Sequence, residues 1–352
     1  MPDPSHSSST PAQREAPLIE AKGLRKRYRL NRQRLFEPAP TVQAVDDVSF
    51  KVTRATTFGL VGESGSGKTT VAKMLLKLER PTAGNLLVDG KDIFQQDAAG
   101  ERQYRSTVQT VLQDPYGALS PRLRVGRIIA EPWVTKTGKG WADGESHAGD
   151  LMELVGLRRS DLRKFPHEFS GGQRQRIAIA RALSVDPSII VLDESVSALD
   201  VSVRAQVLKL LEEVQRKLGV TYLFIGHDLA VVRYMSTDVG VMYLGQLVEI
   251  GSTLQVFSHS RHPYTRQLVA AASDETRIGA LVPGGDLPSP INPPSGCRFH
   301  TRCPFATPLC SEQEPILRAI DAGHLGRCHH MEQIGAPGQD TRELSPAPAS
   351  GC

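Results

Sequence analysis

The stretch TTFGLVGESGSGKTTVAKMLLKL, residues 56–78, joins an apolar run to an amphipathic run through a glycine-rich turn. The run TTFGLV is typical of a strand buried on both faces, and the apolar spacing after the turn is typical of a helix. The turn itself, GESGSGKT, fits the strand–GxxxxGK(S/T)–helix pattern of a phosphate-binding loop. The segment therefore predicts an α/β core in which a buried strand leads directly into an anion-binding helix.

The residues of this turn suit a bound phosphate. Its glycines let successive backbone N–H groups converge on one anion. The amine of Lys68 can reach the terminal phosphates, and the hydroxyl of Thr69 can ligate Mg²⁺, which accepts few protein ligands. A glycine-rich turn without a ligand is the alternative, but the strand before it and the helix after it argue against that reading. The residues expected to contact the nucleotide are Gly62, Glu63, Ser64, Gly65, Ser66, Gly67, Lys68, Thr69 and Thr70.

A second apolar run, SIIVLDES at residues 188–195, ends in two carboxylates. An acidic residue at the end of a buried strand can hold Mg²⁺, which makes Asp193 a candidate metal ligand. The adjacent Glu194 can orient and deprotonate an attacking water. Alone, these would be ordinary carboxylates at a strand end. Combined with the phosphate loop, they predict nucleotide hydrolysis.

The composition excludes several classes of protein. With 352 residues, 39% hydrophobic and 23% charged, the chain can form one large soluble domain with an appendage. The net charge of +4 is too small to argue for nucleic acid as a partner. No apolar run is long enough to cross a bilayer, and the first residues lack the apolar core of a secretory signal. We therefore expect a cytoplasmic protein whose membrane role, if any, depends on a partner.

The chain divides into four parts by pattern. Residues 1–17 and 336–352 are rich in Pro and Ser or Gly and predict disordered tails. Residues 18–257 carry the strands and motifs of one domain, and a rise in proline content marks a C-terminal extension at 258–335. Within the domain, LIEAKGLRKRYRL and AVDDVSFKV alternate and predict edge strands of an antiparallel sheet. Residues from about 115 to 180 are helical in pattern, with TKTGKGWADGESHAG at 135–149 as a surface loop.

A second glycine-rich turn raises a question, because one nucleotide needs only one cradle. The segment FSGGQRQRIAIARAL, residues 169–183, opens another helix, and Ser170 alone would suggest a plain N-cap. It follows VLQDP and precedes IIVLDE, SALD and GHD. In that order it resembles the signature motif of ATP-binding cassette (ABC) proteins. The resemblance covers roughly residues 18–255 and implies a RecA-like phosphate-loop core with an antiparallel β flank and a helical signature subdomain.

The resemblance also implies a shared active site. ATP would lie between the phosphate loop of one subunit and the signature of a second ABC ATPase subunit. The signature residues that would contact the partner's ATP are Ser170, Gly171, Gly172 and Gln173. Asp200 corresponds to the residue of a loop that crosses the dimer interface. Tyr28 corresponds to the aromatic that stacks on adenine, although a half-buried strand tyrosine would look the same.

Three catalytic residues follow from the same resemblance: Glu194 as general base, His227 as the switch histidine and Gln113 as a residue that contacts magnesium and the attacking water. Magnesium would be held by Thr69, Gln113 and Asp193. Gly226 and Ser195 depart from the residues commonest at their positions, but neither corresponds to a catalytic group.

Three further segments are similar to the oligopeptide/dipeptide importer branch: QDPYGALSPRLRVGRIIAEP, FSHSRHPYTRQLVAA and PSPINPPSGCRFHTRCPFATPLC. The branch implies ATP hydrolysis that energises peptide import through two separate permease subunits and an extracytoplasmic solute-binding protein. The subunit would be peripheral on the cytoplasmic face of the inner (plasma) membrane. Import of nickel chelates or other solutes, and pairing with an identical or a paralogous ATPase subunit, remain open. A soluble ABC ATPase of repair or translation is disfavoured, because the chain has neither a coiled-coil insert nor a second cassette.

The C-terminal extension carries clustered thiols at Cys297, Cys303, Cys310 and Cys328. In a reducing cytosol, such clustering indicates metal more often than disulfides. Four sulfur ligands suit a [4Fe–4S] cluster, which we expect, or a structural zinc ion. Zinc could also use His300, His324, His329 or His330. Reduced, buried thiols without metal are the remaining alternative. An iron–sulfur assembly scaffold would also explain the cysteines, but not the HPYT run.

Overall fold

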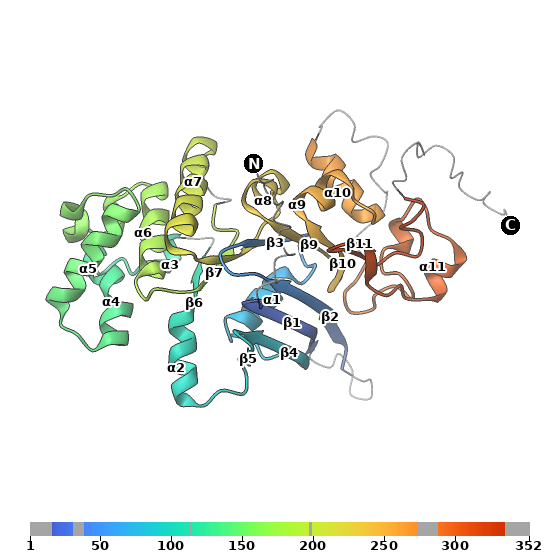
Figure 1. Cartoon of the computed structure of the whole chain (residues 1–352), viewed down its shortest axis with the longest axis horizontal. Helices are drawn as coiled ribbons and strands as arrows, with labels where there is room; N and C mark the ends of the chain where they lie inside the picture. The colour runs from blue at the N-terminus through green and yellow to red at the C-terminus, as the bar shows by residue number, and fades with distance from the viewer. Residues whose placement is uncertain (1–15, 31–38, 113–114, 197–198, 274–287, 335–352) are drawn as a thin grey trace, which may run out of the picture.

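The computed structural model describes residues 16–30, 39–112, 115–196, 199–273 and 288–334. The predicted disordered tails therefore lie almost wholly outside the described residues, and so does the predicted site residue Gln113. The described chain is elongated, as Figure 1 shows. A group of helices forms one end, a mixed α/β core lies in the centre, and the C-terminal extension forms the other end.

The core is an eight-stranded sheet in the order β11-β12-β10-β9-β3-β8-β7-β6. Its parallel part contains β3 (Thr57–Val61), β6 (Val108–Val111), β7 (Ile189–Asp193), β8 (Thr221–Ile225) and β9 (Asp238–Tyr243). Every residue of β3 and β8 is buried, as the apolar composition of such strands predicts. Because these strands are parallel, their carboxyl ends meet at one edge of the sheet.

A smaller antiparallel sheet packs beside the core in the order β2-β1-β4-β5. It consists of β1 (Ile19–Arg29), β2 (Thr41–Val52), β4 (Ala83–Val88) and β5 (Lys91–Asp92). The expectation that both N-terminal segments are edge strands is wrong for β1, which pairs with β2 on one side and β4 on the other. The alternating pattern reports a half-buried strand but does not show how many neighbours it has.

Helices cover the two sheets. Helix α1 (Lys68–Leu75) packs against β2, β7 and β8 and buries Val71, Met74 and Leu75 in the core shared by both sheets. Helix α2 (Ala98–Thr107) precedes β6. Helices α7 (Val201–Leu218), α8 (Leu229–Met235) and α9 (Thr253–Ser258) belong to the second half of the core.

The helical end of the molecule contains α3 (Pro115–Ala118), α4 (Val125–Thr137), α5 (Trp141–Leu154) and α6 (Gly171–Leu183). Short 3₁₀ turns at Arg159–Arg163 and Pro166–Glu168 connect α5 to α6. The expected surface loop at 135–149 is wrong for most of its length, because α5 already begins at Trp141. A β-carbon on Gly144 would lie 2.6 Å from Cγ2 of Val134, so this glycine allows α5 to pack closely on α4.

The C-terminal extension continues the core sheet. After α10 (Pro263–Ser273), the chain forms a 3₁₀ turn (His300–Arg302), α11 (Pro308–Glu312) and the hairpin of β11 (Arg318–Asp321) and β12 (His324–Gly326). Strand β12 pairs with β10 (Gln246–Ser252). At this junction the fully buried carboxylate of Glu249 accepts hydrogen bonds from the backbone N–H groups of Arg261 (2.7 Å) and His262 (3.0 Å), and Nε2 of His324 lies 2.8 Å from it. One carboxylate therefore joins α10 and the hairpin to the sheet.

We predict that Glu249→Ala lowers the free energy of unfolding by about 3–5 kcal/mol, because it leaves the buried His262 N–H and His324 ring, and the partly buried Arg261 N–H, without their acceptor. Glu332→Ala is the matched control, since it removes a carboxylate from an exposed ion pair with Arg318. The control should cost no more than about 1 kcal/mol. Urea denaturation measures both losses, and equal losses would contradict a tethering role for Glu249.

Candidate functional site

The phosphate loop is pressed between two strands that belong to different sheets. Gly62, Gly65 and Gly67 have φ angles of 145°, 78° and 107°, which disfavour any other residue. A β-carbon on Gly62 would lie 2.1 Å from the carbonyl oxygen of Met242, and one on Gly67 would lie 2.3 Å from that of Ala44. The loop therefore requires glycine at these two positions both for its backbone angles and for space.

Lys68 is the first residue of α1 and is buried. Its Nζ donates to the carbonyl oxygens of Gly62 (2.7 Å) and Glu63 (2.8 Å) and to Oγ of Ser66 (3.3 Å). Burial lowers the pKa of Lys68, and the nearby carboxylates of Glu194, Asp193 and Glu63 act against that shift. The charge of this amine is thus directed at the concave side of the loop, where the first N–H groups of α1 also have no partner within the helix.

The two predicted acidic residues lie at the carboxyl end of β7, at the same edge of the sheet: Asp193 ends the strand and Glu194 follows it. Burial, and then the neighbouring Glu194 carboxylate, raise the pKa of Asp193. A divalent cation would reverse this shift, because it stabilises the ionised carboxylate. Glu194 has a φ of 46°, which is rare for a residue with a side chain, and its N–H donates to the carbonyl oxygen of Ile225 (2.9 Å). Unusual backbone of this kind occurs often at functional sites.

The turn at Glu194 brings its carboxylate to the end of β8. Nδ1 of His227 lies 3.2 Å from Oε1 of Glu194, and the imidazole is 60% exposed. Arg204 of α7 supports the same segment by donating to Oδ2 of Asp228 (2.8 Å). A carboxylate held beside an exposed imidazole can accept a proton from a water molecule. Lys68, Asp193, Glu194 and His227 thus lie together at the carboxyl ends of β3, β7 and β8.

Tyr28 lies next to the other end of the phosphate loop. It is half-buried on β1, and the amine of Lys26 lies 5.0 Å from the centre of its ring. Burial raises the pKa of Tyr28, whose hydroxyl interacts with Thr70 and Glu79. The contact with Thr70 places the ring beside the predicted nucleotide residues, whereas Gln113 lies outside the described residues.

The signature turn begins α6 and is exposed at its tip. Ser170 caps the helix, since its Oγ accepts from the N–H of Gln173 (3.4 Å) and its own N–H donates to Oε1 of Gln173 (3.0 Å). Gly172 has no room for a β-carbon, which would lie 2.2 Å from Cγ1 of Val203. Ser170 therefore does act as an N-cap. Its side chain and that of Gln173 are nevertheless exposed to solvent.

The two glycine-rich turns occupy different parts of the molecule. Helix α6 packs against α3, α4, α5, α7 and β6, whereas α1 packs against β2, β7 and β8. Figure 1 shows α6 among the helices at one end and α1 beneath the centre of the sheet. Asp200, also exposed, precedes α7. One chain thus presents two helix N-termini that suit anions, on helices that lie in different parts of the molecule.

The four clustered cysteines are all free and line one small pocket. Burial raises the pKa of Cys303 and of Cys328 to about 12, and it also raises the pKa of Cys297. His300, His329 and His330 line the same pocket, whereas His324 is bound to Glu249 instead. Among the described residues, no group of three or more His, Cys, Asp or Glu side chains is gathered closely enough to hold a metal ion.

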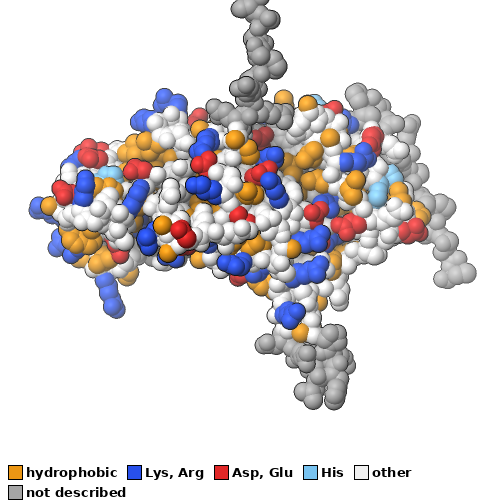
Figure 2. Space-filling model, turned by 60° about the horizontal axis from the view of Figure 1, so that its bottom comes forward, with side chains coloured by type: hydrophobic (Ala, Val, Ile, Leu, Met, Phe, Trp, Pro, Cys, Tyr) orange, Lys and Arg blue, Asp and Glu red, His pale blue; other side chains and the backbone are white. Residues whose placement is uncertain are grey.

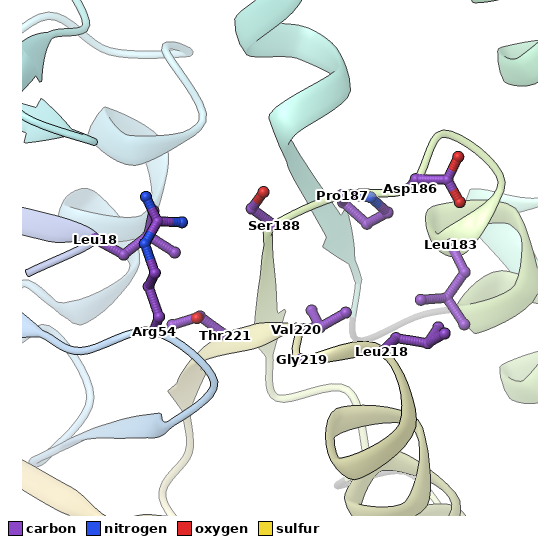
Figure 3. Close-up of a pocket in the computed structure, with 10 residues that line it drawn as sticks. All are labelled: Leu18, Arg54, Leu183, Asp186, Pro187, Ser188, Leu218, Gly219, Val220 and Thr221. Carbon is purple, nitrogen blue, oxygen red and sulfur yellow. The ribbon is translucent and has the colours of Figure 1, made fainter. Parts of the chain in front are cut away.

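A cavity of about 250 Å³ lies at the opposite edge of the core, at the amino ends of β7 and β8. Its charged lining residues are Arg54, which pairs with Asp89, and Asp186. Figure 3 shows that Arg54 and Asp186 lie on opposite sides of the pocket and do not converge. This cavity therefore lacks a cluster of converging charged side chains such as the one around Lys68.

Sequence reasoning missed two residues that contact the phosphate loop. Tyr264 accepts a hydrogen bond from the N–H of Glu63, and Arg302 forms an ion pair with the Glu63 side chain. Both belong to the C-terminal extension, more than 200 positions away in sequence. Tyr264 stands in the HPYT run, which indicated the family branch without indicating this contact.

Comparisons with known proteins agree with the geometry. Residues 45–197 match the family described as ABC transporter, and residues 248–310 match the family described as oligopeptide/dipeptide transporter, C-terminal region. The dipeptide transport ATP-binding protein DppF of Haemophilus influenzae is 45% identical over 90% of this chain and 97% of its own length. DppF of Escherichia coli is 43% identical over 94% of this chain and 99% of its own. A dimeric structure of the bacterial ABC transporter cassette MJ0796 matches with a TM-score of 0.58 and 25% identity, covering 67% of this chain and 98% of that one.

We predict that Glu194→Gln lowers the rate of ATP turnover by at least about a hundredfold, because the amide cannot accept a proton from water. ATP binding should persist, since the phosphate loop is unchanged. Steady-state phosphate release and equilibrium nucleotide binding measure the two effects. Turnover near the unsubstituted rate would exclude Glu194 as the general base.

Proposed function

The chain belongs to the ABC transporter family, and we propose that it is the subunit that hydrolyses ATP to energise import of peptides through separate membrane permease subunits. The observation that supports the peptide assignment is that both the cassette and the C-terminal extension are similar to those of peptide-transport ATP-binding proteins. The relatives named as dipeptide transport ATP-binding proteins align over nearly the whole chain, including that extension.

In this proposal each residue at the carboxyl ends of the parallel strands has a separate role in phosphoryl transfer. Lys68 and the N–H groups of the phosphate loop bind the terminal phosphates. Glu194 takes the proton from the attacking water, and His227 orients that carboxylate. Thr69 and Asp193, with Gln113, are the residues that would hold Mg²⁺, which when bound supplies positive charge beside the phosphate oxygens. Tyr28 would support the adenine ring.

We infer that the signature serves ATP bound to a second ATPase subunit. Three observations support this: α1 and α6 pack against different elements, Ser170 and Gln173 are exposed, and Asp200 is exposed directly before α7. The similar cassette MJ0796 has a dimeric structure. Two ATPase subunits related by a twofold or pseudo-twofold axis would each complete the other's site, because in such a contact the signature of each subunit meets the phosphate loop of the other.

A groove between α2 and α4 suits a permease. It has a volume of about 1030 Å³ and is lined mainly by polar residues, with the cations Arg102, Arg105, Lys136 and Arg181 outnumbering Glu131 and Asp186. Figure 2 turns the lower side of Figure 1 forward and shows many Lys and Arg side chains on this face, with acidic ones among them. Gln109 of β6, shortly before the segment with Gln113, also lines the groove. A cytoplasmic permease segment with acidic residues would thus dock near the amino ends of β6 and β7, at the edge of the sheet opposite the catalytic residues.

The described helices include none with the length and apolar content that a membrane crossing requires. In the proposed complex, the chain is peripheral on the cytoplasmic face of the inner membrane and contacts the bilayer only through its permeases. An extracytoplasmic solute-binding protein would deliver the peptide on the other side.

The shared site is tested by Ser170→Arg in the assembled transporter. We expect ATP turnover to fall by about a hundredfold or more, because the arginine side chain prevents close approach of the signature to the partner's γ-phosphate. Binding of ATP to the isolated subunit should remain. Ser146→Arg makes the same substitution at an exposed position of α5 and should have little effect. Full turnover in the Ser170 variant would refute the shared site.

We further propose that Cys297, Cys303, Cys310 and Cys328 hold a [4Fe–4S] cluster. Four free thiols, one of them on α11, line one pocket, which suits a shared metal centre. A single zinc ion gathers its ligands to within about 2.3 Å of one point. The raised pKa values of Cys303 and Cys328 mean that metal binding must displace protons from these two thiols.

Anaerobic purification tests this proposal. We expect about four iron and four sulfide per chain, and loss of both in Cys303→Ser, because the cluster requires all four thiolates. Elemental analysis measures iron and zinc on the same sample. About one zinc per chain would contradict the cluster and indicate a structural zinc site instead. Absence of both metals would show that the four cysteines are reduced thiols without metal.

A further inference from the structure

The second residue of the phosphate loop is held by the C-terminal lobe, defined here as residues 263–273 and 288–334. The guanidinium of Arg302 donates from Nη1 to Oε2 of Glu63 and from Nη2 to Oε1, both at 3.0 Å. The N–H of Glu63 donates to Oη of Tyr264 at 2.8 Å. Side chain and backbone of Glu63 are therefore both bound by residues of this lobe.

These contacts have the geometry of a firm attachment. A bidentate guanidinium–carboxylate pair fixes orientation as well as distance. The Arg302 and Glu63 side chains are only 12% and 26% exposed, so solvent screens the pair less than a surface ion pair. The hydroxyl of Tyr243 lies 3.4 Å from Nη1 of Arg302 and provides further support.

An aromatic cluster holds the two attaching side chains in place. The rings of Tyr243 and Tyr264 lie 4.7 Å apart, and Phe299 packs against both at 5.2 and 5.4 Å. The guanidinium of Arg302 lies 5.8 Å from the rings of Tyr243 and Phe299. Since all three rings are buried, Arg302 and Tyr264 have little freedom to move away from Glu63.

The attachment extends to the phosphate-binding amine. The carbonyl oxygen of Glu63 accepts from Nζ of Lys68 at 2.8 Å and from the N–H of Ser66 at 3.2 Å. The position of Glu63 thus sets the position of the amine and of the loop's central residues. The lobe is itself joined to the core elsewhere, because Arg298 bonds to Asp46 and Arg327 donates to Oδ2 of Asp47 at 3.0 Å.

We propose that the C-terminal lobe positions the phosphate loop for ATP through Arg302 and Tyr264, which act on Glu63. The inference rests on the proposed function of the loop in ATP binding. Arg302 and Tyr264 are positioning residues, since they reach the nucleotide site only through Glu63. Arg302 ends the 3₁₀ turn that directly precedes Cys303, so the cysteine pocket and this attachment share one turn.

The expected effect is on nucleotide affinity. Without the attachment, the loop occupies its binding-competent conformation for a smaller fraction of the time, and the apparent Kd rises by the inverse of that fraction. We expect Arg302→Ala to raise the Kd and the KM for ATP by about tenfold, with a smaller fall in kcat. Tyr264→Phe removes one oxygen and should raise Kd less, by about threefold.

The experiment uses the full chain for ATP binding and the assembled transporter for KM and kcat. The double variant Arg302→Ala with Glu63→Ala should bind ATP no more weakly than the weaker single variant, because both remove the same interaction. The charge-exchanged pair Arg302→Glu with Glu63→Arg should recover part of the lost affinity. Arg318→Ala is the matched control, since it breaks an ion pair of the same lobe with Glu332 and should leave Kd unchanged.

Several outcomes would overturn the proposal. Unchanged Kd in both Arg302→Ala and Tyr264→Phe would refute it while the unsubstituted protein still bound ATP, so the proposed function would stand. Equal weakening by Arg318→Ala, or additive losses in the double variant, would show a general effect on stability instead. If Arg302→Ala does not fold, Tyr264→Phe and the charge-exchanged pair decide the question. Failure of the unsubstituted protein to bind ATP would instead refute the proposed function.

Discussion

The close approach of the phosphate loop to two backbone carbonyls is the constraint on which the rest of the site depends. Gly62 faces the carbonyl of Met242 in β9, and Gly67 faces that of Ala44 in β2, at distances that leave no room for a β-carbon. The loop therefore occupies the junction between the eight-stranded sheet and the antiparallel sheet. Because both sheets confine it, the N-terminus of α1 and the amine of Lys68 have defined positions before any nucleotide binds.

Catalytic geometry follows from the order of the parallel strands. Strand β8 lies between β3 and β7, with Ile225 opposite both Leu60 and Asp193. Residues just beyond these strands are consequently neighbours, although they are far apart in sequence. The left-handed backbone at Glu194 then directs its carboxylate toward His227. An ATPase of this kind thus needs a phosphate loop, a correct strand order and one unusual backbone conformation, each of which depends on packing elsewhere.

The incorrect expectations share a physical cause. The polar segment 135–149 predicted a surface loop, yet Gly144 lets α5 approach Val134, and a β-carbon on Gly149 would lie 2.7 Å from the Arg159 guanidinium. Alternation in β1 indicated one buried face, which an inner strand of this sheet also has. A local sequence pattern indicates which residues are buried and where the backbone is flexible. It does not indicate which neighbouring element packs against them.

The sequence by itself determined the phosphate loop, the acidic strand end, the signature turn and the family, because each of these is a local pattern in which spacing and residue type carry the chemistry. Only the tertiary structure decided that β12 extends the core sheet, that Glu249 joins the extension to it, and that Arg302 and Tyr264 reach Glu63. Those contacts join segments separated by up to 239 positions. No periodicity encodes them, since they arise only when folding brings distant segments of the chain together.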